Sequence, residues 1–505
     1  MIQTLLFLLP LLVVFLPFAL KYLYVFQIKE YRFDRLFSQM REDGLVTFII
    51  GHIGRRPAIT TRNILVGGIS SVLFIVANFL ILLTISQKIF LNDTACYGSM
   101  CFANHTIQTA GSPQELLAII ALFLITPFSA FVSTALGVMA TEPLAQQKRR
   151  AIIARATAKV ARSNTIFIGI SGSYGKTTTK EYLFHILSQK YHVAKTDENM
   201  NTDVGVSMSI LKNLKKDTEY FVAEVGAYKL GEVKRAASIF KPHHVIMTPF
   251  GNQHLDLYGS KENLVSAESE ILSVMRPNGI VYANADIPEL GYIKTHATGR
   301  LMTYSIHQKA DVTADVIETS EKGSTANIHY DDQSITIHTK LLGKHVIQNL
   351  LPVIATAIRA GMPPDAIAQA IVSLDHIPGK LSIHAGYNGA VILNDSSNSS
   401  VNGFVAALDT MRLFNKPKKY ILSKGIIELG KAKRESYEKL IVQIDKDHVR
   451  LYTTDNLFKK LSKSKNITIM RTEEQLLRSI VSQIDDQSVV LLEGKFTKSF
   501  VKKFL

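Results

Sequence analysis

The chain begins with long uncharged apolar runs. Three of them, Ile2–Leu20, Ile64–Ser86 and Leu116–Ala140, are each long enough to cross the roughly 30 Å hydrocarbon core of a bilayer. They predict three transmembrane helices at about residues 2–21, 64–86 and 116–140. The first run could instead be a cleaved signal peptide. No basic side chain precedes it and no small-x-small cleavage site follows it, which favours a retained span.

From residue 165 onward, short apolar runs alternate with stretches of helical spacing, which is typical of a parallel α/β sheet. After residue 300 the pattern changes to strict alternation, which predicts a small antiparallel layer. A second α/β unit begins near His384, with its first strand at Gly389–Asn394. The predicted organisation is therefore a membrane domain (1–150), a central α/β domain (151–383) and a C-terminal α/β domain (384–505).

One glycine-rich stretch lies between a predicted buried strand, Thr165–Ile170, and a predicted helix. It contains the pattern G-x-x-G-K-T-T, although the strict phosphate-loop pattern would place glycine where this chain has Ile170. Glycines let backbone N–H groups turn inward toward an anion, and the helix N-terminus adds positive charge. A chance glycine turn is the alternative, but the flanking strand and helix favour nucleotide binding. The residues predicted to bind the nucleotide are Gly172, Ser173, Gly175, Lys176, Thr177 and Thr178.

The net charge of +15 could indicate nucleic acid, but the placement of the basic residues indicates membrane topology. Basic side chains crowd the segments between the first two apolar runs and after the third, whereas Lys88 alone lies between the second and third. The positive-inside rule then places the N-terminus outside and everything after residue 141 in the cytoplasm. The expected location is the cell membrane, with several spans. Cys96 and Cys101 fall in the outer loop, where a disulfide or two free thiols are both possible.

Two further side chains follow predicted strands, at the edge where such sheets place ligands. Glu224 is a natural ligand for Mg²⁺, which prefers oxygen, although a surface carboxylate is the alternative. His254 follows another strand and is either a ligand or a structural histidine.

With these motifs in view, residues 165–505 resemble the ATP-dependent Mur ligases of peptidoglycan synthesis, most of all the branch that adds D-alanyl-D-alanine. The matching segments, in order, are Gly172–Thr178, Glu198–Val206, Glu224–Val233, His254–Ser260, Asn284–Asp286, Gly343–Asn349, Pro378–Leu381, Asn394–Asn398, Gly425–Gly430 and Glu493–Lys495. The resemblance implies a phosphate-loop central domain and a Rossmann-like C-terminal domain.

The resemblance also implies a reaction. ATP phosphorylates a substrate carboxylate, and an amine then attacks the acyl phosphate to form an amide. Charge neutralisation by Lys176 and Mg²⁺ is the main physical need, and domain closure would exclude water. By analogy, Thr177, Glu224 and His254 hold Mg²⁺, and Lys176, Glu224, His254 and Glu268 are catalytic. Asn284, Asp286, Asn349 and Asp395 contact the nucleotide, and Asn201, Lys380 and Asn398 contact the substrate.

The sequence departs from the family pattern in three places. Glu268 stands where the family carries a lysine that becomes carbamylated to bind Mg²⁺, and we expect its carboxylate to hold Mg²⁺ directly, a surface-helix glutamate being the alternative. Asn394 and Lys380 replace an aspartate and an arginine. The membrane segment occupies the place of the family's UDP-sugar-binding domain, so the acid substrate could be lipid-linked.

The leading interpretation is a membrane-anchored ligase that joins D-Ala-D-Ala or a similar amine to a muramyl-peptide carboxylate at the cytoplasmic face. One alternative is a membrane ligase of the same chemistry that makes another polymer, such as poly-γ-glutamate. Another is a non-catalytic ATP-binding scaffold. A transporter motor fits poorly, because no charge within the spans could line a permeation path.

Overall fold

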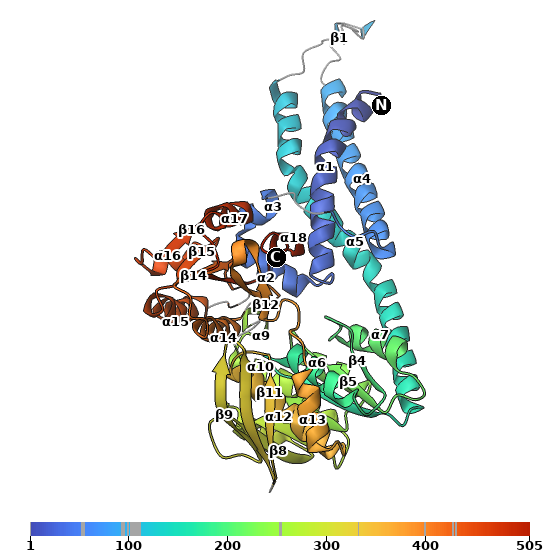
Figure 1. Ribbon diagram of the computed structural model, residues 1–505. Coiled ribbons are helices and arrows are strands. Elements are labelled where there is room, and N and C mark those ends of the chain that lie inside the picture. Colours follow the sequence, from blue (N-terminus) through green and yellow to red (C-terminus); the bar gives the residue numbers. More distant parts are fainter. Residues whose placement is uncertain are drawn as a thin grey trace. The chain divides into compact units, whose positions relative to one another are not determined.

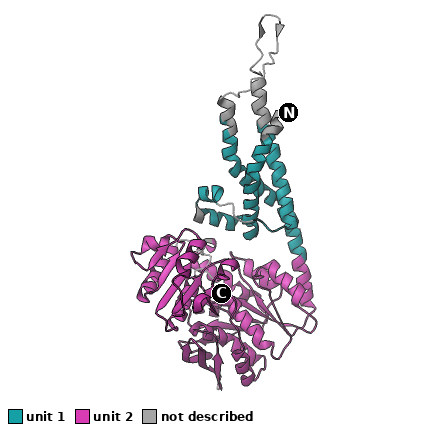
Figure 2. Ribbon diagram, turned by 45° about the horizontal axis from the view of Figure 1, so that its top comes forward, with its two compact units in different colours: residues 1–151 teal, residues 152–505 magenta. Residues whose placement is uncertain are grey.

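The computed structural model describes residues 2–51, 56–91, 96–97, 100–101, 113–251, 255–331, 333–397, 400–426, 429 and 432–505. These residues form two compact units, Met1–Ala151 and Ile152–Leu505, which Figure 2 colours separately. The predicted metal ligand His254 and the predicted substrate contact Asn398 lie outside the described residues.

The first unit is helical and apolar. Its elements are α1 (Ile2–Ile28), α2 (Phe33–Asp43), α3 (Leu45–Ile50), α4 (Thr61–Leu91), β1 (Cys96–Tyr97), β2 (Met100–Cys101) and most of α5 (Pro113–Ala161). Within the described residues, α1, α4 and α5 are long and apolar enough to span a membrane, over Leu8–Ile28, Thr61–Ile81 and Ile120–Ala161. The three predicted apolar helices are therefore helices, and each continues beyond the predicted apolar run. β1 and β2 pair Cys96 with Cys101 in register.

The second unit contains a nine-stranded sheet whose strand order is β11-β10-β9-β8-β7-β6-β3-β5-β4 (Figure 1). Pairing is parallel from β4 to β9 and antiparallel from β9 to β11. The strands are β3 (Ile166–Ser171), β4 (Val193–Lys195), β5 (Tyr220–Glu224), β6 (His244–Met247), β7 (Ile280–Asn284), β8 (Arg300–Ser305), β9 (Val312–Ser320), β10 (Gly323–Tyr330) and β11 (Gln333–Thr339).

Helices cover both faces of this sheet. They are α6 (Lys176–Leu187), α7 (Asp203–Asn213), α8 (Glu232–Ser238), α9 (Leu255–Tyr258), α10 (Lys261–Ser269), η1 (Glu270–Val274), α11 (Leu290–His296), α12 (Lys344–Arg359) and α13 (Pro364–Val372).

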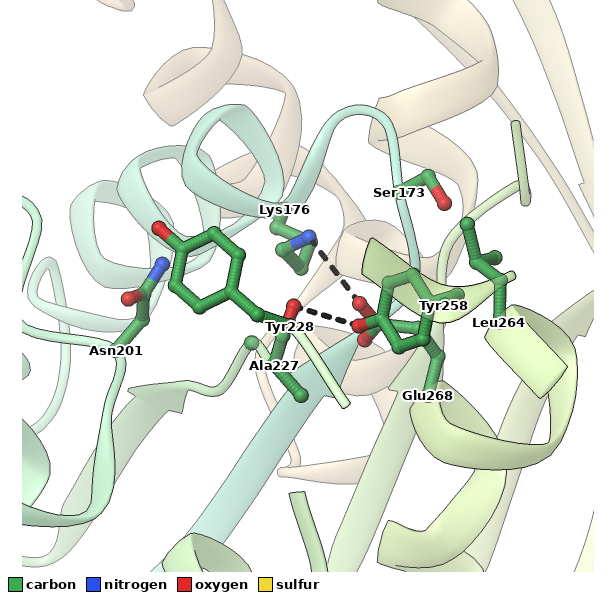
Figure 3. Close-up of a pocket in the computed structure, with 9 residues that line it drawn as sticks. Ser173, Lys176, Asn201, Ala227, Tyr228, Tyr258, Leu264 and Glu268 are labelled. Atoms are coloured by element: carbon green, nitrogen blue, oxygen red, sulfur yellow. Dashed lines mark hydrogen bonds and ion pairs between the residues drawn. The ribbon is translucent and has the colours of Figure 1, made fainter. Parts of the chain in front are cut away.

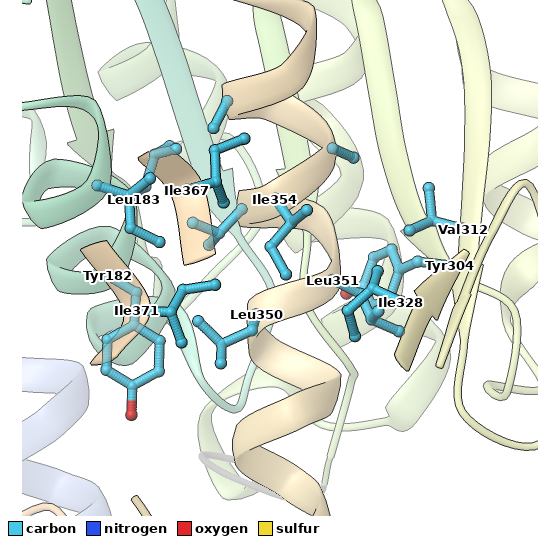
Figure 4. Packing of buried hydrophobic residues seen from close by; sticks show 14 of the residues in the cluster. Tyr182, Leu183, Tyr304, Val312, Ile328, Leu350, Leu351, Ile354, Ile367 and Ile371 are labelled. Carbon is cyan, nitrogen blue, oxygen red and sulfur yellow. The ribbon is translucent and has the colours of Figure 1, made fainter. Parts of the chain in front are cut away.

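The alternation of side chains along each strand creates two hydrophobic cores. On β3, Ile168 and Ile170 pack with α6, α12 and α13, whereas Phe167 packs on the opposite face with α7 and α8. Figure 4 shows Leu350, Leu351 and Ile354 of α12 within the first of these cores. This layered α/β arrangement fixes β3 between β5 and β6, so the loop that follows β3 lies beside the carboxyl ends of these two neighbouring parallel strands.

A six-stranded sheet follows, in the order β12-β13-β17-β14-β15-β16. Its strands are β12 (Ser382–Ala385), β13 (Val391–Asp395), β14 (Lys418–Ser423), β15 (Arg450–Thr453), β16 (Ile467–Ile469) and β17 (Ser488–Glu493). The other elements of this region are η2 (Tyr387–Gly389), α14 (Val401–Arg412), α15 (Lys433–Lys446), α16 (Leu457–Leu461), α17 (Glu473–Val481) and α18 (Lys498–Val501). All pairs except β12–β13 are parallel, so the predicted α/β class is confirmed.

Candidate active site

The phosphate loop connects β3 to α6. Gly172 and Gly175 have φ angles of 123° and 78°, in the region that favours glycine. A Cβ at Gly172 would lie 2.4 Å from the carbonyl oxygen of Thr248, and one at Gly175 would lie 2.6 Å from Oδ1 of Asn349. The backbone of Thr248 therefore leaves no room for a side chain at Gly172, and the positive φ favours glycine at both positions. Lys176 and Thr177 begin α6, where N–H groups of the first turn have no partner within the helix.

Glu268 of α10 is buried against this loop. Its Oε2 accepts hydrogen bonds from the Ser171 hydroxyl at 2.7 Å and from the Gly172 N–H at 3.1 Å. Its Oε1 lies 4.0 Å from Nζ of Lys176, which also donates to the carbonyl oxygen of Gly172. One carboxylate oxygen is thus held by the loop, and the other faces the lysine (Figure 3).

A pocket lies between the side chains of Lys176 and Glu268. It is lined by Ser173, Lys176, Asn201, Gly226, Ala227, Tyr228, Tyr258, Leu264 and Glu268. The Tyr258 hydroxyl donates to the carbonyl oxygen of Ala227 at 2.6 Å, as the dashed line in Figure 3 shows. Burial, followed by the charge of Glu268, raises the pKa of Tyr258, which keeps its hydroxyl protonated as a hydrogen-bond donor to the Ala227 carbonyl oxygen.

Glu224 ends β5 and is buried. Its Oε2 lies 3.3 Å from Nζ of Lys180, and its Oε1 accepts a hydrogen bond from Nδ2 of Asn201 at 3.3 Å. Lys180 is fully buried one turn after Lys176 on α6, and its ammonium group also lies 3.6 Å from Glu181. Within the described part of the chain, Nζ of Lys180 makes no hydrogen bond, so these two ion pairs hold it. Glu181 in turn pairs with Lys195.

The predicted nucleotide contacts lie at the neighbouring strand ends. Asn284 ends β7 and accepts a hydrogen bond from the Asp286 N–H at 2.7 Å, and its Nδ2 is a buried donor with no acceptor among the described residues. Asp286 accepts from the Ser305 hydroxyl at 2.5 Å. The amide of Asn349, on α12, reaches the phosphate loop at Gly175.

The third group of predicted residues lies at the carboxyl ends of the strands of the six-stranded sheet, which we call the edge of this sheet. Asp395 ends β13 and accepts a hydrogen bond from the Leu381 N–H, next to Lys380, at 3.1 Å. It is paired across the sheet with Glu493, which ends β17 and is fully buried. Burial, followed by the charge of Asp395, raises the pKa of Glu493 well above its ordinary value.

Sequence reasoning missed Lys180, Tyr258 and Glu493 as parts of these clusters. A lysine four residues after Lys176 lies on the same helix face, which was a usable signal for Lys180. Tyr258 and Glu493 acquire their neighbours only through tertiary contacts. Among the described residues, no group of three or more His, Cys, Asp or Glu side chains is placed to hold a metal ion.

Comparison with known proteins bears directly on this geometry. Residues 170–357 match the model of the Mur ligase middle domain. The matching residues contain the phosphate loop, Glu224, Glu268 and the predicted nucleotide contacts Asn284, Asp286 and Asn349.

Sequence relatives extend the similarity beyond the Mur ligase domain. The chain is 29% identical over 311 residues to the UDP-N-acetylmuramoyl-tripeptide–D-alanyl-D-alanine ligase of Bacillus subtilis (strain 168), covering 60% of this chain and 65% of that protein. It is 30% identical over 246 residues to the ligase of the same name from Escherichia coli (strain K12), covering 48% of this chain and 54% of that protein. The chain thus spans less than two thirds of the length of these two curated relatives.

Solved structures agree on the fold. MurF from Acinetobacter baumannii superposes with a TM-score of 0.65 at 23% identity, over 70% of this chain and 80% of that one. MurF ligase from Thermotoga maritima, solved in complex with ADP, gives 0.63 at 24% identity, over 70% and 81%.

Proposed function

We propose that the protein is an ATP-dependent ligase that joins a cell-wall precursor carboxylate to an amine. The observation that carries the proposal is the phosphate loop held by Glu268, with Lys176 facing the same pocket. Relatives named as UDP-N-acetylmuramoyl-tripeptide–D-alanyl-D-alanine ligases support D-Ala-D-Ala as the amine and a muramyl-tripeptide as the acid.

The loop fits a polyphosphate. Gly172 and Gly175 have positive φ angles and let the loop turn closely against Thr248 and Asn349, and the first turn of α6 adds N–H donors at a positive helix end. Lys176 would release the Gly172 carbonyl and bind the terminal phosphates of ATP. Asn349 and Asn284 would contact the base, with Asp286 nearby, and Asp395 would approach the ribose from the C-terminal domain.

The donor set also fits Mg²⁺, since the Thr177 hydroxyl and the carboxylates of Glu224 and Glu268 offer hard oxygen ligands. Oε1 of Glu268 accepts no hydrogen bond from the described residues and faces the pocket. We assign Mg²⁺ to these three residues together with His254. When bound, the ion neutralises the phosphate charge that would otherwise repel a carboxylate.

The proposed reaction has two steps, phosphorylation of the carboxylate and attack by the amine. The substrate carboxylate oxygen bonds to the γ-phosphorus as the bond to ADP breaks. The amine nitrogen then bonds to the acyl carbon as the carbon–oxygen bond to phosphate breaks, and the amine loses a proton. The part of this chain is to hold the two anions together and to exclude water, and Asn201, Lys380 and Asn398 would contact the substrate.

We further propose that the first unit anchors the enzyme in the cell membrane. Within this unit, charged and aromatic side chains meet at the ends of the helices that the positive-inside rule places in the cytoplasm. Arg62, near the start of α4, pairs with Glu142 of α5 at 2.6 Å, and its guanidinium lies 4.0 Å from the ring centre of Tyr31, which follows α1. The three apolar helices therefore share one polar end, as an inserted bundle requires.

Phosphate release by the detergent-solubilised full chain tests the ligase proposal. The acids are UDP-muramyl-tripeptide, lipid-linked muramyl-tripeptide and glutamate, each assayed with D-Ala-D-Ala and with other amines. We expect release with one muramyl-tripeptide and D-Ala-D-Ala, and a loss of about 10²–10³-fold in Lys176→Ala, because a preorganised charge on the phosphates is removed. Lys322→Ala, in an exposed turn, is the matched control and should retain full activity.

Each other outcome rejects part of the proposal. Release with glutamate alone would indicate another polymer, such as poly-γ-glutamate. ATP binding without release for any acid and amine pair would indicate a non-catalytic scaffold.

A further inference from the structure

One lysine interrupts the apolar sequence of the first helix. Lys21 of α1 is buried, and its ammonium group donates to three backbone carbonyl oxygens, those of Phe48 at 2.6 Å, Ile49 at 3.2 Å and Gly51 at 2.7 Å. The hydroxyl of Tyr22 donates to the Ile49 carbonyl at 3.0 Å. These carbonyls lie at the C-terminal end of α3, so two neighbouring side chains of α1 cap that helix.

Such a cap has a physical reason in a membrane. The last carbonyls of a helix have no partner within it, and in hydrocarbon no water can replace the missing hydrogen bonds. A lysine in an apolar span is equally costly unless acceptors surround it. Joining Lys21 to the end of α3 satisfies both groups at once, and a positive charge also complements the helix C-terminus.

The side chains of α3 fit the same environment. Residues 44–51, Gly-Leu-Val-Thr-Phe-Ile-Ile-Gly, carry no charge. Phe48 points inward and packs beside Tyr22 and Phe131, whereas Leu45, Val46 and Ile50 are exposed. Three large apolar side chains facing water on a six-residue helix would be unusual in a soluble loop.

The preceding helix makes the contrast clear. α2 contains Asp34, Arg35 and Arg41, which suit headgroups and water, although it is connected to α3 by a single glycine. The chain therefore changes from a charged helix to an uncharged one directly before the backbone carbonyls that contact Lys21. Lys21 is the last residue of the predicted first span and lies roughly 10 Å before the end of α1. α3 thus lies level with the cytoplasmic edge of that span.

We propose that α3 inserts into the cytoplasmic leaflet as a short membrane-embedded helix, with Leu45, Val46 and Ile50 in contact with lipid acyl chains. Lys21 fixes its depth. This inference rests on the proposed membrane anchoring, which the following experiment tests separately.

Three valines with nearly equal exposure provide matched probe sites. Val13 on α1 is 68% exposed, Val46 on α3 is 70% exposed, and Val442 on α15 of the second unit is 67% exposed. Each is replaced by cysteine in the full chain, with Cys96 and Cys101 replaced by serine, and labelled with a nitroxide. The proteins are reconstituted in vesicles of phosphatidylcholine and phosphatidylglycerol, and accessibility to oxygen is compared with accessibility to a water-soluble nickel chelate.

We expect the labels at Val13 and Val46 to favour oxygen and the label at Val442 to favour nickel. If Val46 behaved as Val442 does while Val13 favoured oxygen, the insertion of α3 would be refuted and the anchoring would stand. If Val13 also favoured nickel, both proposals would fail. A label at Val46 that is shielded from both reagents and broadened by a second label would indicate contact with another copy of the chain and would also refute the inference.

Lys21→Met, made with the Val46 label, tests the role of the cap. Loss of the ammonium leaves the α3 carbonyls without that donor, so we expect the Val46 label to gain mobility and nickel access. Lys21→Arg, which keeps a donor, should restore most of the wild-type behaviour, and the Val13 label should remain unchanged in both variants. Unchanged signals at Val46 in Lys21→Met would refute the cap.

Discussion

The carboxylates beside the phosphate loop and those at the edge of the six-stranded sheet are neutralised in different ways. Glu268 faces a hydroxyl, an N–H group and an ammonium, and Glu224 faces the ammonium of Lys180. Glu493 instead faces Asp395, a second carboxyl group, across the ladder. Ammonium groups and hydrogen-bond donors lie beside the first pair, whereas a full charge on both members of the second pair carries a penalty.

This difference separates two kinds of site. Carboxylates that already have partners can receive a cation and an anionic substrate with little change of charge. At the buried acid pair of Asp395 and Glu493, burial and the neighbouring carboxylate instead raise the pKa of Glu493 and favour a bound proton. The contrast suggests that the phosphate-loop edge is organised for charged ligands. The following changes test the contrast. At the first site they remove a charge that belongs to an ion pair, and at the second site they replace one of the two acids by a neutral amide.

Replacing Lys180 by methionine should have the largest effect. It leaves Glu224 buried without its main cation, which costs about 3–5 kcal/mol when one partner of a buried pair is lost. We expect a lower unfolding temperature without nucleotide. Magnesium and ATP should then raise this temperature more in Lys180→Met than in the wild type, because bound Mg²⁺ would supply the missing charge only in the folded state.

Lys195→Met is the matched control, since Lys195 pairs with Glu181 and not with Glu224. It should lower stability slightly and leave the response to magnesium and ATP as in the wild type. An equal response in Lys180→Met and the wild type would show that Lys180 does not compensate the charge of Glu224 at a metal site.

The sequence could predict the local parts of this arrangement. The strand, glycine loop and helix at residues 166–187 are contiguous, so hydrophobic pattern and loop glycines suffice to predict them. The three apolar helices were predictable for the same reason. Glu268 entered the candidate site only through resemblance, because its contact with Ser171 joins residues far apart in the chain.

Other parts depend on tertiary contacts that no local pattern encodes. β4 and β16 have three residues each, too few for a periodicity. The alternation at residues 312–339 predicts an antiparallel layer, and these strands are antiparallel, yet β9 also extends the main sheet through the parallel pairs Tyr304–Val312 and Ser305–Thr313. Lys180 illustrates the same limit, since its partner Glu224 comes from another element.

The next largest effect is expected from Glu268→Gln. The amide can still accept from Ser171 and Gly172, but it carries no charge for Lys176 or a metal ion. We expect phosphate release to fall about 10²-fold, the usual cost of losing one preorganised electrostatic group. The magnesium concentration for half-maximal release should rise as well, and a magnesium titration measures both.

Glu270→Gln is the matched control two residues away. Glu270 accepts from the N–H groups of Gly231 at 2.6 Å and Lys234 at 3.1 Å, at the start of α8 and away from the phosphate loop. This change should alter stability but not the magnesium dependence. If Glu268→Gln retained the wild-type rate and magnesium dependence, Glu268 would be a structural cap of the loop and not a metal ligand.

The smallest effect concerns the pH dependence of stability at the other sheet edge. Because the pKa of Glu493 is raised on folding, the folded protein keeps a proton that the unfolded chain releases above its ordinary pKa of about 4.5. The stability contributed by this group is therefore fully present below that value and is lost as pH rises toward the raised pKa. Glu493→Gln keeps the neutral form at every pH and can donate to Asp395. We expect its unfolding temperature to exceed that of the wild type by a few degrees, on the order of 1 kcal/mol, at pH 8, and to match it near pH 4.5.

Glu473→Gln separates this effect from a general loss of charge in the same domain. Glu473 pairs with Lys424 at 2.6 Å and is partly exposed, so its removal should cost less than about 1 kcal/mol and should not raise the unfolding temperature at pH 8. Equal pH profiles for Glu493→Gln and the wild type would mean that the acid pair is charged in the folded protein. The two sites would then not differ in how their carboxylates are neutralised, because the cations and donors around Asp395 and Glu493 would hold both charges, as Lys180 holds Glu224.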